Sequence, residues 1–322
     1  ILPNSYILHL VIDSSGNMYA VYKDSSTYYV VKFDSSGNVV SSFGTDGKMT
    51  ISGFTLRDLD VNTSKIAAVG YNGTDGYIAQ YSSSNGTVDA GFDTTNSDGI
   101  VDFKVGGVDT AAYEVSYDSN GKIVVGGTFG GNNTTKVFIG RFKSNGDLDN
   151  TTFDSSDDGF YTVDNTTLSN PNGATGVGID GLAIASDNKI FLGIRGIYPA
   201  SLEDTCDIHK LNDNGSLDTS FDSDGKLSVG SSNSIDRIFQ FDVNSNDDLY
   251  FRGRKNSTYD FSGGGWGEIV SKVDGSGTYS SVKDDFDGTP YLFTGPVGSK
   301  VVALNKKIEG LTYELTYHKL VD

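Results

Sequence analysis

The sequence is poor in several residue types, and each scarcity excludes a class of protein. A single cysteine, Cys206, excludes an internal disulfide framework and a cysteine-cluster metal site. Apolar runs are short, far below the ~20 residues of a membrane-spanning helix, so we expect no membrane insertion. Basic residues are also scarce: 24 Lys and Arg stand against 42 Asp and Glu, a net charge of −18. A chain this acidic is not drawn to a phosphate backbone, so we expect no nucleic-acid partner.

Turn formers and aromatic residues are abundant instead. The 322 residues include 41 Gly, 18 Phe, 18 Tyr and one Trp. The aromatic side chains are enough for a sizeable core, which excludes a disordered acidic tail. Aromatic and turn-forming residues together predict an all-β structure. The first residue is Ile1 rather than Met, and we expect a processed or trimmed start.

A turn-and-strand block recurs five times along the chain. Each copy has a glycine turn, then a Phe, then in most copies an Asp-Gly pair, and a polar turn with a short apolar run precedes it. The turn glycines are Gly37, Gly86, Gly146, Gly215 and Gly277. Asn-Gly and Asp-Gly between alternating runs are strong hairpin signals, because such turns need positive φ. Each unit therefore reads as four short antiparallel strands.

Four strands per unit without helical periodicity predict a β-propeller. A β-helix would need a shorter period, and a β-sandwich would not repeat internally. We predict one domain over residues 1–322, a single β-propeller of six four-stranded blades, the last one incomplete. The expected blades are 5–52, 53–104, 105–168, 169–230, 231–290 and 291–322. We also expect the Phe after each turn to be buried between blades, namely Phe43, Phe92, Phe153, Phe221 and Phe286.

Two segments carry a family resemblance. Residues 121–127 (GKIVVGG) are followed by a strand that ends in Arg-Phe, and residues 214–226 read NGSLDTSFDSDGK. These segments resemble the delta-60 repeat, a family of β-propeller-like domains in secreted and surface proteins of bacteria and archaea. The usual Arg at the end of the third strand is kept only at Arg141. The resemblance implies a fold and a location, and no catalytic residues.

The sequence contains no motif that brings candidate catalytic or metal-binding residues together. We expect His9, His209 and His318 to be strand side chains far from one another, and Cys206 to be a buried thiol. Acids near the starts of first strands could form a ring at a propeller mouth or simply cap loops; they are Asp58, Asp109, Asp180 and Asp236. We therefore expect no cofactor.

Aspartate-rich turns leave one metal hypothesis open. Asp154 and Asp158 have the spacing of half a calcium loop, and hard oxygen ligands suit Ca²⁺. The bidentate acid expected after the turn is missing, so an Asx-type turn, in which Asp accepts local backbone N–H bonds, is the competing interpretation.

Loop positions carry signals for modification and for ligands. Nine N-x-Ser/Thr sequons fall in expected turns or loops and predict N-glycans; they are Asn62, Asn72, Asn85, Asn132, Asn133, Asn150, Asn165, Asn214 and Asn256. Trp266, in a Gly-rich loop, could stack on a sugar ring or pack against the next blade.

The open last blade predicts an assembly. Its third strand would expose an edge to be completed by the chain's own N-terminus or by a neighbouring molecule. The residues that we assign to this contact are apolar: Ile1, Leu2, Leu311, Leu315 and Leu320. The main hypothesis is a non-enzymatic, glycosylated, extracellular or cell-surface building block that forms homopolymeric filaments by donor-strand addition. The alternative is a glycan-binding or channel-centred β-propeller enzyme, of the lyase or hydrolase type.

Overall fold

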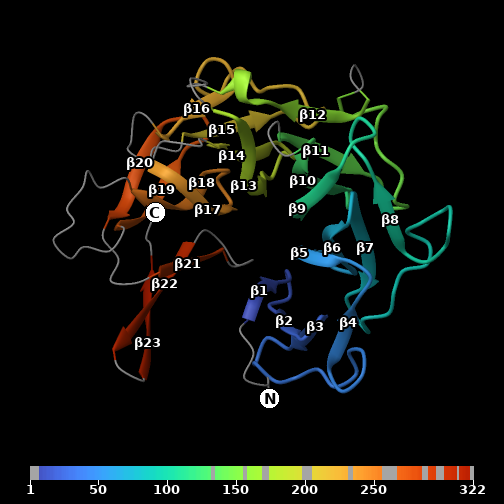
Figure 1. Ribbon diagram of the computed structural model, residues 1–322. Helices are drawn as coiled ribbons and strands as arrows, with labels where there is room; N and C mark the ends of the chain where they lie inside the picture. The colour runs from blue at the N-terminus through green and yellow to red at the C-terminus, as the bar shows by residue number, and fades with distance from the viewer. Residues whose placement is uncertain are drawn as a thin grey trace. The chain divides into compact units, whose positions relative to one another are not determined.

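The computed structural model describes residues 7–131, 135–154, 158–168, 174–197, 205–230, 235–255, 267–284, 289–294, 301–309 and 312–319; from residue 282 onward, only backbone is described. The regular structure is almost entirely β-strand (Figure 1), with a 3-10 helix at Asn165–Thr167. This confirms the all-β prediction. No helix in these ranges is long and apolar enough to cross a membrane.

Three four-stranded antiparallel sheets, here called blades, lie in the first half of the chain. Blade 1 is β1 (Ile7–Ile12), β2 (Met18–Asp24), β3 (Thr27–Phe33) and β4 (Lys48–Ile51). Blade 2 is β5 (Thr55–Val61), β6 (Lys65–Asn72), β7 (Asp75–Ser82) and β8 (Ile100–Phe103). Blade 3 is β9 (Thr110–Tyr117), β10 (Ile123–Phe129), β11 (Lys136–Phe142) and β12 (Phe160–Val163).

Two further blades and a smaller sheet follow. Blade 4 is β13 (Gly176–Ile184), β14 (Ile190–Ile197), β15 (Cys206–Leu211) and β16 (Lys226–Ser228). Blade 5 is β17 (Ile235–Val243), β18 (Leu249–Lys255), β19 (Gly267–Val273) and β20 (Tyr279–Asp284). The last sheet has three strands, β21 (Thr289–Thr294), β22 (Val301–Glu309) and β23 (Thr312–Lys319).

The chain divides into two compact units, which we describe separately. The first unit comprises residues 1–131 and 138–160, and the second comprises residues 132–137 and 161–322. Blades 1 and 2 belong to the first unit, and blades 4 and 5 to the second.

The prediction of six blades is wrong: there are five four-stranded blades, and the last sheet has only three strands. The error arises in blade 5. We expected its fourth strand after Gly288, whereas β20 follows the turn at Gly277 directly and pairs with β19. The strand after Gly288 is β21, which pairs with β22 instead. The hairpin of β22 and β23 then completes a three-stranded sheet, to which no fourth strand is paired in the described ranges.

Glycine turns form the hairpins as the sequence indicates. The five repeat glycines all have positive φ, between 70° and 96°: Gly37, Gly86, Gly146, Gly215 and Gly277. At Gly146 a Cβ atom would lie 2.1 Å from the backbone oxygen of Phe92, so the turn after β11 tolerates no side chain. The turns also use Asx geometry. Asp118, for example, accepts the backbone N–H groups of Asn120 and Lys122, both at 2.9 Å.

The repeated Phe is a core residue in the first four repeats. Phe43, Phe92, Phe153 and Phe221 are fully buried, which confirms that prediction; Phe286 lies outside the described residues. Phe43 packs in a cluster made by blades 1 and 2, and Phe92 in one made by blades 2 and 3. Because a buried Phe contributes roughly 1.5–3 kcal/mol, these rings account for much of the cohesion between neighbouring blades.

A basic residue at the end of the third strand covers the repeated Phe. The Arg141 guanidinium lies 5.1 Å from the Phe153 ring and its Nε donates to Asp149 at 3.0 Å. Lys210 stands at the same step of blade 4, 5.7 Å from the Phe221 ring. The position that the resemblance marks as Arg is therefore a packing and ion-pairing position.

The first strand of each blade contains a β-bulge. The bulged residues are Leu8, Arg57, Tyr113 and Asp180 in the first four blades, and both Asp236 and Phe239 in β17. A bulge bends the strand and redirects the side chains around it, and bulges are frequent beside active sites. Side chains next to a bulge on a first strand therefore point in directions that the regular alternation of a strand would not give them.

Candidate active site

An imidazole–carboxylate pair joins the first strands of blades 1 and 2. His9 follows the bulge of β1, Asp58 follows the bulge of β5, and His9 Nδ1 lies 3.3 Å from Asp58 Oδ1. The His9 side chain is 40% exposed, whereas that of Asp58 is 13% exposed. A carboxylate at Nδ1 places the imidazole proton there, so Nε2 keeps its lone pair. No described residue forms a hydrogen bond with Nε2.

Asp58 also connects two blades through its second oxygen. Oδ2 accepts the backbone N–H of Val115 in β9 at 2.8 Å, and Oδ1 accepts the N–H of Leu59 at 2.7 Å. Burial raises the pKa of the Asp58 carboxyl, and this effect exceeds the opposing effects of His9 and of the two N–H groups. Asp58 is thus held rigidly beside His9 and shifted toward titration at higher pH.

A second, half-buried carboxyl lies two residues further along the same face of β5. Asp60 Oδ2 accepts the backbone N–H of Tyr117 at 2.8 Å and Oδ1 accepts that of Val61 at 2.7 Å. Burial raises the pKa of Asp60 to about 6, although these N–H groups oppose the shift. A carboxyl that titrates near neutral pH can act as a general acid or a general base.

An arginine next to Asp58 in the sequence stacks with two tyrosines. Arg57, at the bulge of β5, donates to Tyr71 Oη at 2.8 Å. Its guanidinium lies 5.1 Å from the Tyr71 ring and 5.3 Å from the Tyr113 ring. Arg57 is exposed, and both tyrosines are half-buried. The first strands of blades 1 to 3 thus present basic, aromatic and acidic groups within one unit.

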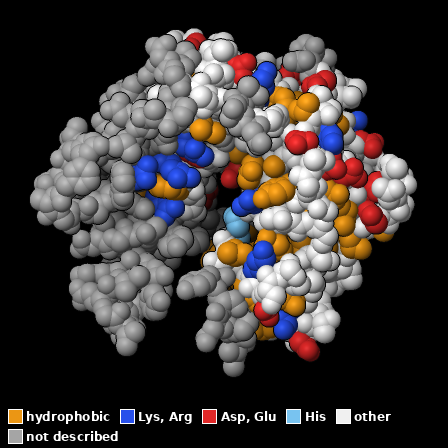
Figure 2. All heavy atoms as spheres, viewed as in Figure 1, with side chains coloured by type: hydrophobic (Ala, Val, Ile, Leu, Met, Phe, Trp, Pro, Cys, Tyr) orange, Lys and Arg blue, Asp and Glu red, His pale blue; other side chains and the backbone are white. Residues whose placement is uncertain are grey.

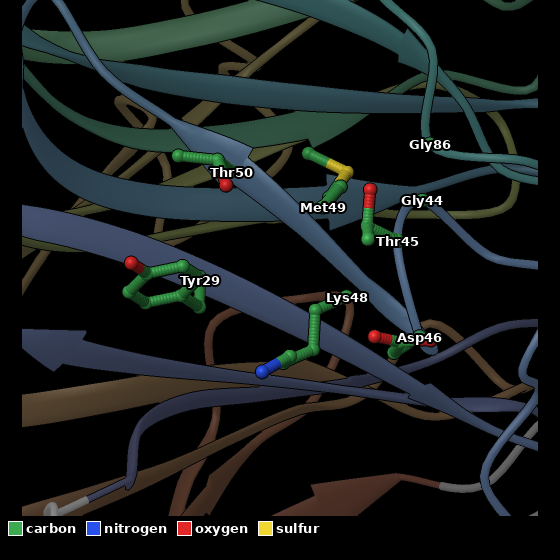
Figure 3. Close-up of a pocket in the computed structure, with 8 residues that line it drawn as sticks. All are labelled: Tyr29, Gly44, Thr45, Asp46, Lys48, Met49, Thr50 and Gly86. Atoms are coloured by element: carbon green, nitrogen blue, oxygen red, sulfur yellow. The ribbon is translucent and has the colours of Figure 1, made fainter.

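A separate pocket of about 390 Å³ lies on blade 1 (Figure 3). Tyr29 of β3 and Lys48 of β4 line it together with Asp46 from the turn before β4. Thr45 and Thr50 add hydroxyl groups. The Lys48 ammonium lies 5.9 Å from the Tyr29 ring, so an aromatic surface, a cation and an anion border one cavity.

The acids singled out near the starts of first strands have different surroundings within their own units. Asp58 and Asp180 lie within first strands, at or beside a bulge, rather than at loop caps. Asp109 is exposed before β9, and Asp236 lies in β17 with its side chain outside the described atoms. Sequence reasoning singled out Asp58 but missed Asp60. The available signal was the alternation Asp58-Leu59-Asp60, which puts two carboxyls on one face of a strand.

His209 and Cys206 lie in the protein core. His209 is fully buried, contacts Tyr161 Oη through Nδ1 at 2.9 Å, and burial lowers its pKa to about 3, so it is a neutral core residue. Cys206 is a buried free thiol. The side chain of His318 and all of Trp266 lie outside what the structure describes.

The calcium hypothesis stays a prediction. Asp154 and Asp158 both have left-handed backbone, with φ of 40° and 44°, and residues 155–157 between them lie outside the described residues. Within the described ranges no three His, Cys, Asp or Glu side chains are grouped to hold a metal ion. In the related turn at Asp93, the carboxylate accepts the N–H groups of Thr95 and Asn96, both at 2.8 Å, which is the Asx geometry.

Glycosylation and assembly also stay predictions. Asn72, Asn85, Asn150 and Asn214 are exposed, and Asn62 and Asn165 are half-buried. The other three sequons, at Asn132, Asn133 and Asn256, lie outside the described residues. So do the assembly residues Ile1, Leu2, Leu311 and Leu320, and for Leu315 only the backbone of β23 is described.

Known proteins share this fold at low sequence identity. A family model described as a domain of unknown function (DUF5122), a β-propeller, matches residues 119–151. No curated protein sequence matches the chain. The structure of regucalcin, a calcium-binding protein from Agrobacterium tumefaciens, is 11% identical, covers 97% of this chain and 88% of its own, and has a TM-score of 0.49.

Two further solved structures have names that denote enzymes. A luciferin-regenerating enzyme is 9% identical over 92% of this chain and 82% of its own, with a TM-score of 0.50. A gluconolactonase from Xanthomonas campestris is 10% identical over 93% of this chain and 82% of its own, with a TM-score of 0.49.

These findings correct our prediction of a non-enzymatic protein. That prediction rested on the lack of a catalytic constellation in the sequence, whereas the fold is shared with an enzyme over most of the chain. Residues distant in the sequence, such as His9 and Asp58, meet only because neighbouring blades place their first strands side by side. At this level of identity the likeness shows the fold: the chain is an all-β protein with a β-propeller fold and five four-stranded blades.

Proposed function

We propose that this chain is a hydrolase whose acid–base centre is His9, Asp58 and Asp60. The observation that carries the proposal is the His9–Asp58 contact at 3.3 Å, with an exposed imidazole on a largely buried carboxylate. This is the arrangement by which a carboxylate fixes the tautomer of a general base. The delta-60 resemblance and the enzyme names of the fold neighbours support a propeller setting for it, without specifying the reaction.

The proposed reaction uses the His9 imidazole as a base and the Asp60 carboxyl as an acid. Nε2 of His9 takes a proton from a water molecule as the water oxygen attacks the substrate, and Asp58 stabilises the imidazolium that forms. Asp60, with a pKa of about 6, returns a proton to the leaving group when it is protonated. After the reaction His9 releases its proton to solvent and Asp60 takes one up from solvent, so the net reaction consumes only water and substrate.

A direct assay would use chromogenic esters, lactones and glycosides as three substrate classes. We expect turnover of one class, and His9→Gln should lower the rate by at least about a hundredfold. Asp102→Asn, which changes an exposed acid of β8, is the matched control and should retain activity. Thermal unfolding of each variant checks that it is folded.

Two results would contradict the hydrolase proposal. One is a wild-type protein that turns over none of the three classes. The other is a His9→Gln variant that is folded and as active as the wild type.

Glycan binding is a second candidate function, and the blade 1 pocket favours it. Its volume of about 390 Å³ is in the range of small-ligand sites, and it combines the Tyr29 ring with Lys48, Asp46 and two threonine hydroxyls. Such a lining can stack on a sugar ring and pair with its hydroxyls. Tyr29→Ala should abolish retardation in affinity electrophoresis through neutral polysaccharides, and Val88→Ala, at a residue 46% exposed, should not. Equal retardation of both variants would exclude the pocket.

An extracellular or cell-surface location belongs with this proposal. It is supported by the sequons, four of which are exposed in the structure, and by the resemblance to secreted repeats. Enzymatic removal of N-glycans from native material should lower its apparent mass; an unchanged mass would count against it.

Self-assembly through Ile1 and Leu2 is tested by their deletion, which should abolish any polymers of the native protein.

A further inference from the structure

The bulged residues of the first three blades occupy corresponding positions in their first strands. Leu8, Arg57 and Tyr113 are the extra residues at the points where the pairing of the first strand with the second strand shifts. All three belong to the first unit, in which β5 contacts both β1 and β9. The extra residue of a bulge is left out of the ladder, and bulges commonly redirect a side chain beside an active site.

Arg57 is the basic member of this group, and two tyrosines hold its guanidinium in place. Its Nη2 donates to Tyr71 Oη, and the guanidinium also lies beside the rings of Tyr71 and Tyr113. The two rings are 6.2 Å apart and tilted by 55°. Because the side chain is already ordered, binding a ligand costs less conformational entropy than it would for a freely rotating arginine.

Arg57 forms no ion pair within the described residues, although the chain has a net charge of −18. Its partner Tyr71 is neutral, so the other N–H donors of the guanidinium have no acceptor in the described structure. The nearest acids in the sequence, Asp58 and Asp60, are occupied by His9 and by backbone N–H groups. Residues 1–6, which precede β1, contain no acid. An exposed guanidinium is therefore available to a ligand.

This arginine lies next to the acid–base pair in the chain. Arg57 directly precedes Asp58, so their Cα atoms are about 3.8 Å apart. His9 follows Leu8 just as Asp58 follows Arg57, so the base and its carboxylate each come directly after a bulge. Figure 2 shows a histidine side chain, in pale blue, on the viewed face among basic side chains, in blue, and hydrophobic side chains, in orange.

We propose that Arg57 binds a carboxylate group of the substrate, so that the proposed hydrolase acts on substrates that carry one negative charge near the bond to be cleaved. A guanidinium binds a carboxylate through paired N–H donors. One guanidinium balances one carboxylate, whereas a phosphate dianion would leave an excess of negative charge beside Asp58. The inference rests on the proposed centre of His9, Asp58 and Asp60 and names its substrate class.

Matched pairs of substrates test this preference in each class of the hydrolase assay. The pairs are para-nitrophenyl hydrogen succinate with para-nitrophenyl butyrate, glucarolactone with gluconolactone, and a para-nitrophenyl glucuronide with the glucoside. In the class that is turned over, we expect the charged member to have a KM lower by at least about tenfold. Arg57→Gln should remove this difference in KM and leave the KM of the neutral member and the kcat of both unchanged.

Calorimetric titration tests the same contact without catalysis. The probes are butyrate and glucuronate, with butyramide and glucose as their uncharged counterparts, at low ionic strength. We expect the full chain to bind at least one acid about tenfold or more tightly than its counterpart, and Arg57→Gln to lose this preference. Lys104→Gln, which removes another exposed cation of the first unit, is the matched control and should keep it.

The inference is overturned if the wild type binds both acids no more tightly than their uncharged counterparts. It is also overturned if an Arg57→Gln variant, shown by thermal unfolding to be folded, keeps the preference for the acid. Equal turnover of charged and neutral substrates rejects the inference and leaves the hydrolase proposal standing. Binding that depends on Arg57 without turnover of any substrate rejects the hydrolase proposal and leaves the carboxylate contact.

Discussion

Charged side chains behave differently at the ends of the third strands and on the first strands. Near the third strands they recur: Lys65 pairs with Asp89 in blade 2, and Lys122 pairs with Asp149 in blade 3. On the first strands they change from blade to blade: Asp58 of β5 meets His9 of β1 in one unit, and Asp180 of β13 meets Arg195 of the second strand β14 in the other. A polar contact that recurs in several blades serves the fold, whereas one that occurs once is free to serve a ligand or a reaction.

The largest expected effect comes from breaking a recurring contact. Asp149→Ala removes the partner of Arg141, whose side chain is 3% exposed, and of Lys122. Breaking a buried ion pair from one side costs about 3–5 kcal/mol, because the buried guanidinium loses the negative charge that compensates its own. Chemical denaturation should show this loss. Lys104→Ala, which removes an exposed partner of Asp75, is the control and should cost at most about 1 kcal/mol.

A smaller effect is expected where the same recurring contact is more exposed. Lys65 and Asp89 have side chains 35% and 23% exposed, so solvent screens their interaction. Asp89→Ala should therefore reduce the free energy of unfolding by only about 1 kcal/mol. A loss as large as that of Asp149→Ala would show that burial does not set the strength of the repeated pair.

A change of pH should affect the free energy of unfolding in opposite directions through the acid near a third strand, Asp149, and the acid on a first strand, Asp60. For Asp149, burial favours the neutral form, but hydrogen bonds from Lys122 and Thr152 and nearby positive charges outweigh it and lower its pKa. The unfolded chain has a pKa of about 3.9 for Asp, so the stabilisation from Asp149 is present above that pH and is lost as the pH falls through its folded value.

Asp60 should act in the opposite direction. Its folded pKa of about 6 exceeds the unfolded value, so its contribution is complete below about pH 4 and is lost as the pH rises through 6. Asp60→Asn should flatten this decline in denaturation curves measured across the same pH range. A variant that keeps the full decline would assign it to other groups.

The smallest effect on stability is expected at His9. Its side chain is 40% exposed and contacts Asp58 at 3.3 Å, so His9→Gln should change the free energy of unfolding by less than about 1 kcal/mol. A much larger loss of stability would show that His9 stabilises the fold and would weaken its assignment as a base.

The repeat made most of the blade architecture predictable, and its deviations explain the errors. Gly146 and Phe153 indicated a turn and a core position, because only particular residues fit positive φ and the blade interior. The sixth blade was wrong because the spacing of blade 5 departs from the repeat, so that β20 follows its turn directly. Residue spacing alone does not show which strand a given segment pairs with.

The candidate site was less predictable for a different reason. His9 and Asp58 are on the first strands of successive blades, and their meeting depends on the bulges that follow Ile7 and Leu56. No local pattern encodes a bulge position in these strands. The contact of Arg57 with Tyr71 and Tyr113 depends in the same way on the bulges of β5 and β9.

The most direct test of the account is a pH titration of the Asp60 carboxyl, monitored by carbon-detected NMR on the isotope-labelled full chain. The signal of Asp60 is assigned as the one that is missing from the Asp60→Asn variant. The account holds that the Asp60 carboxyl is shielded enough from solvent to exchange protons near neutral pH. It predicts a midpoint of about 6 for Asp60. A midpoint near the ordinary value of about 3.9 would contradict it, because Asp60 would then be a solvated, permanently ionised carboxylate.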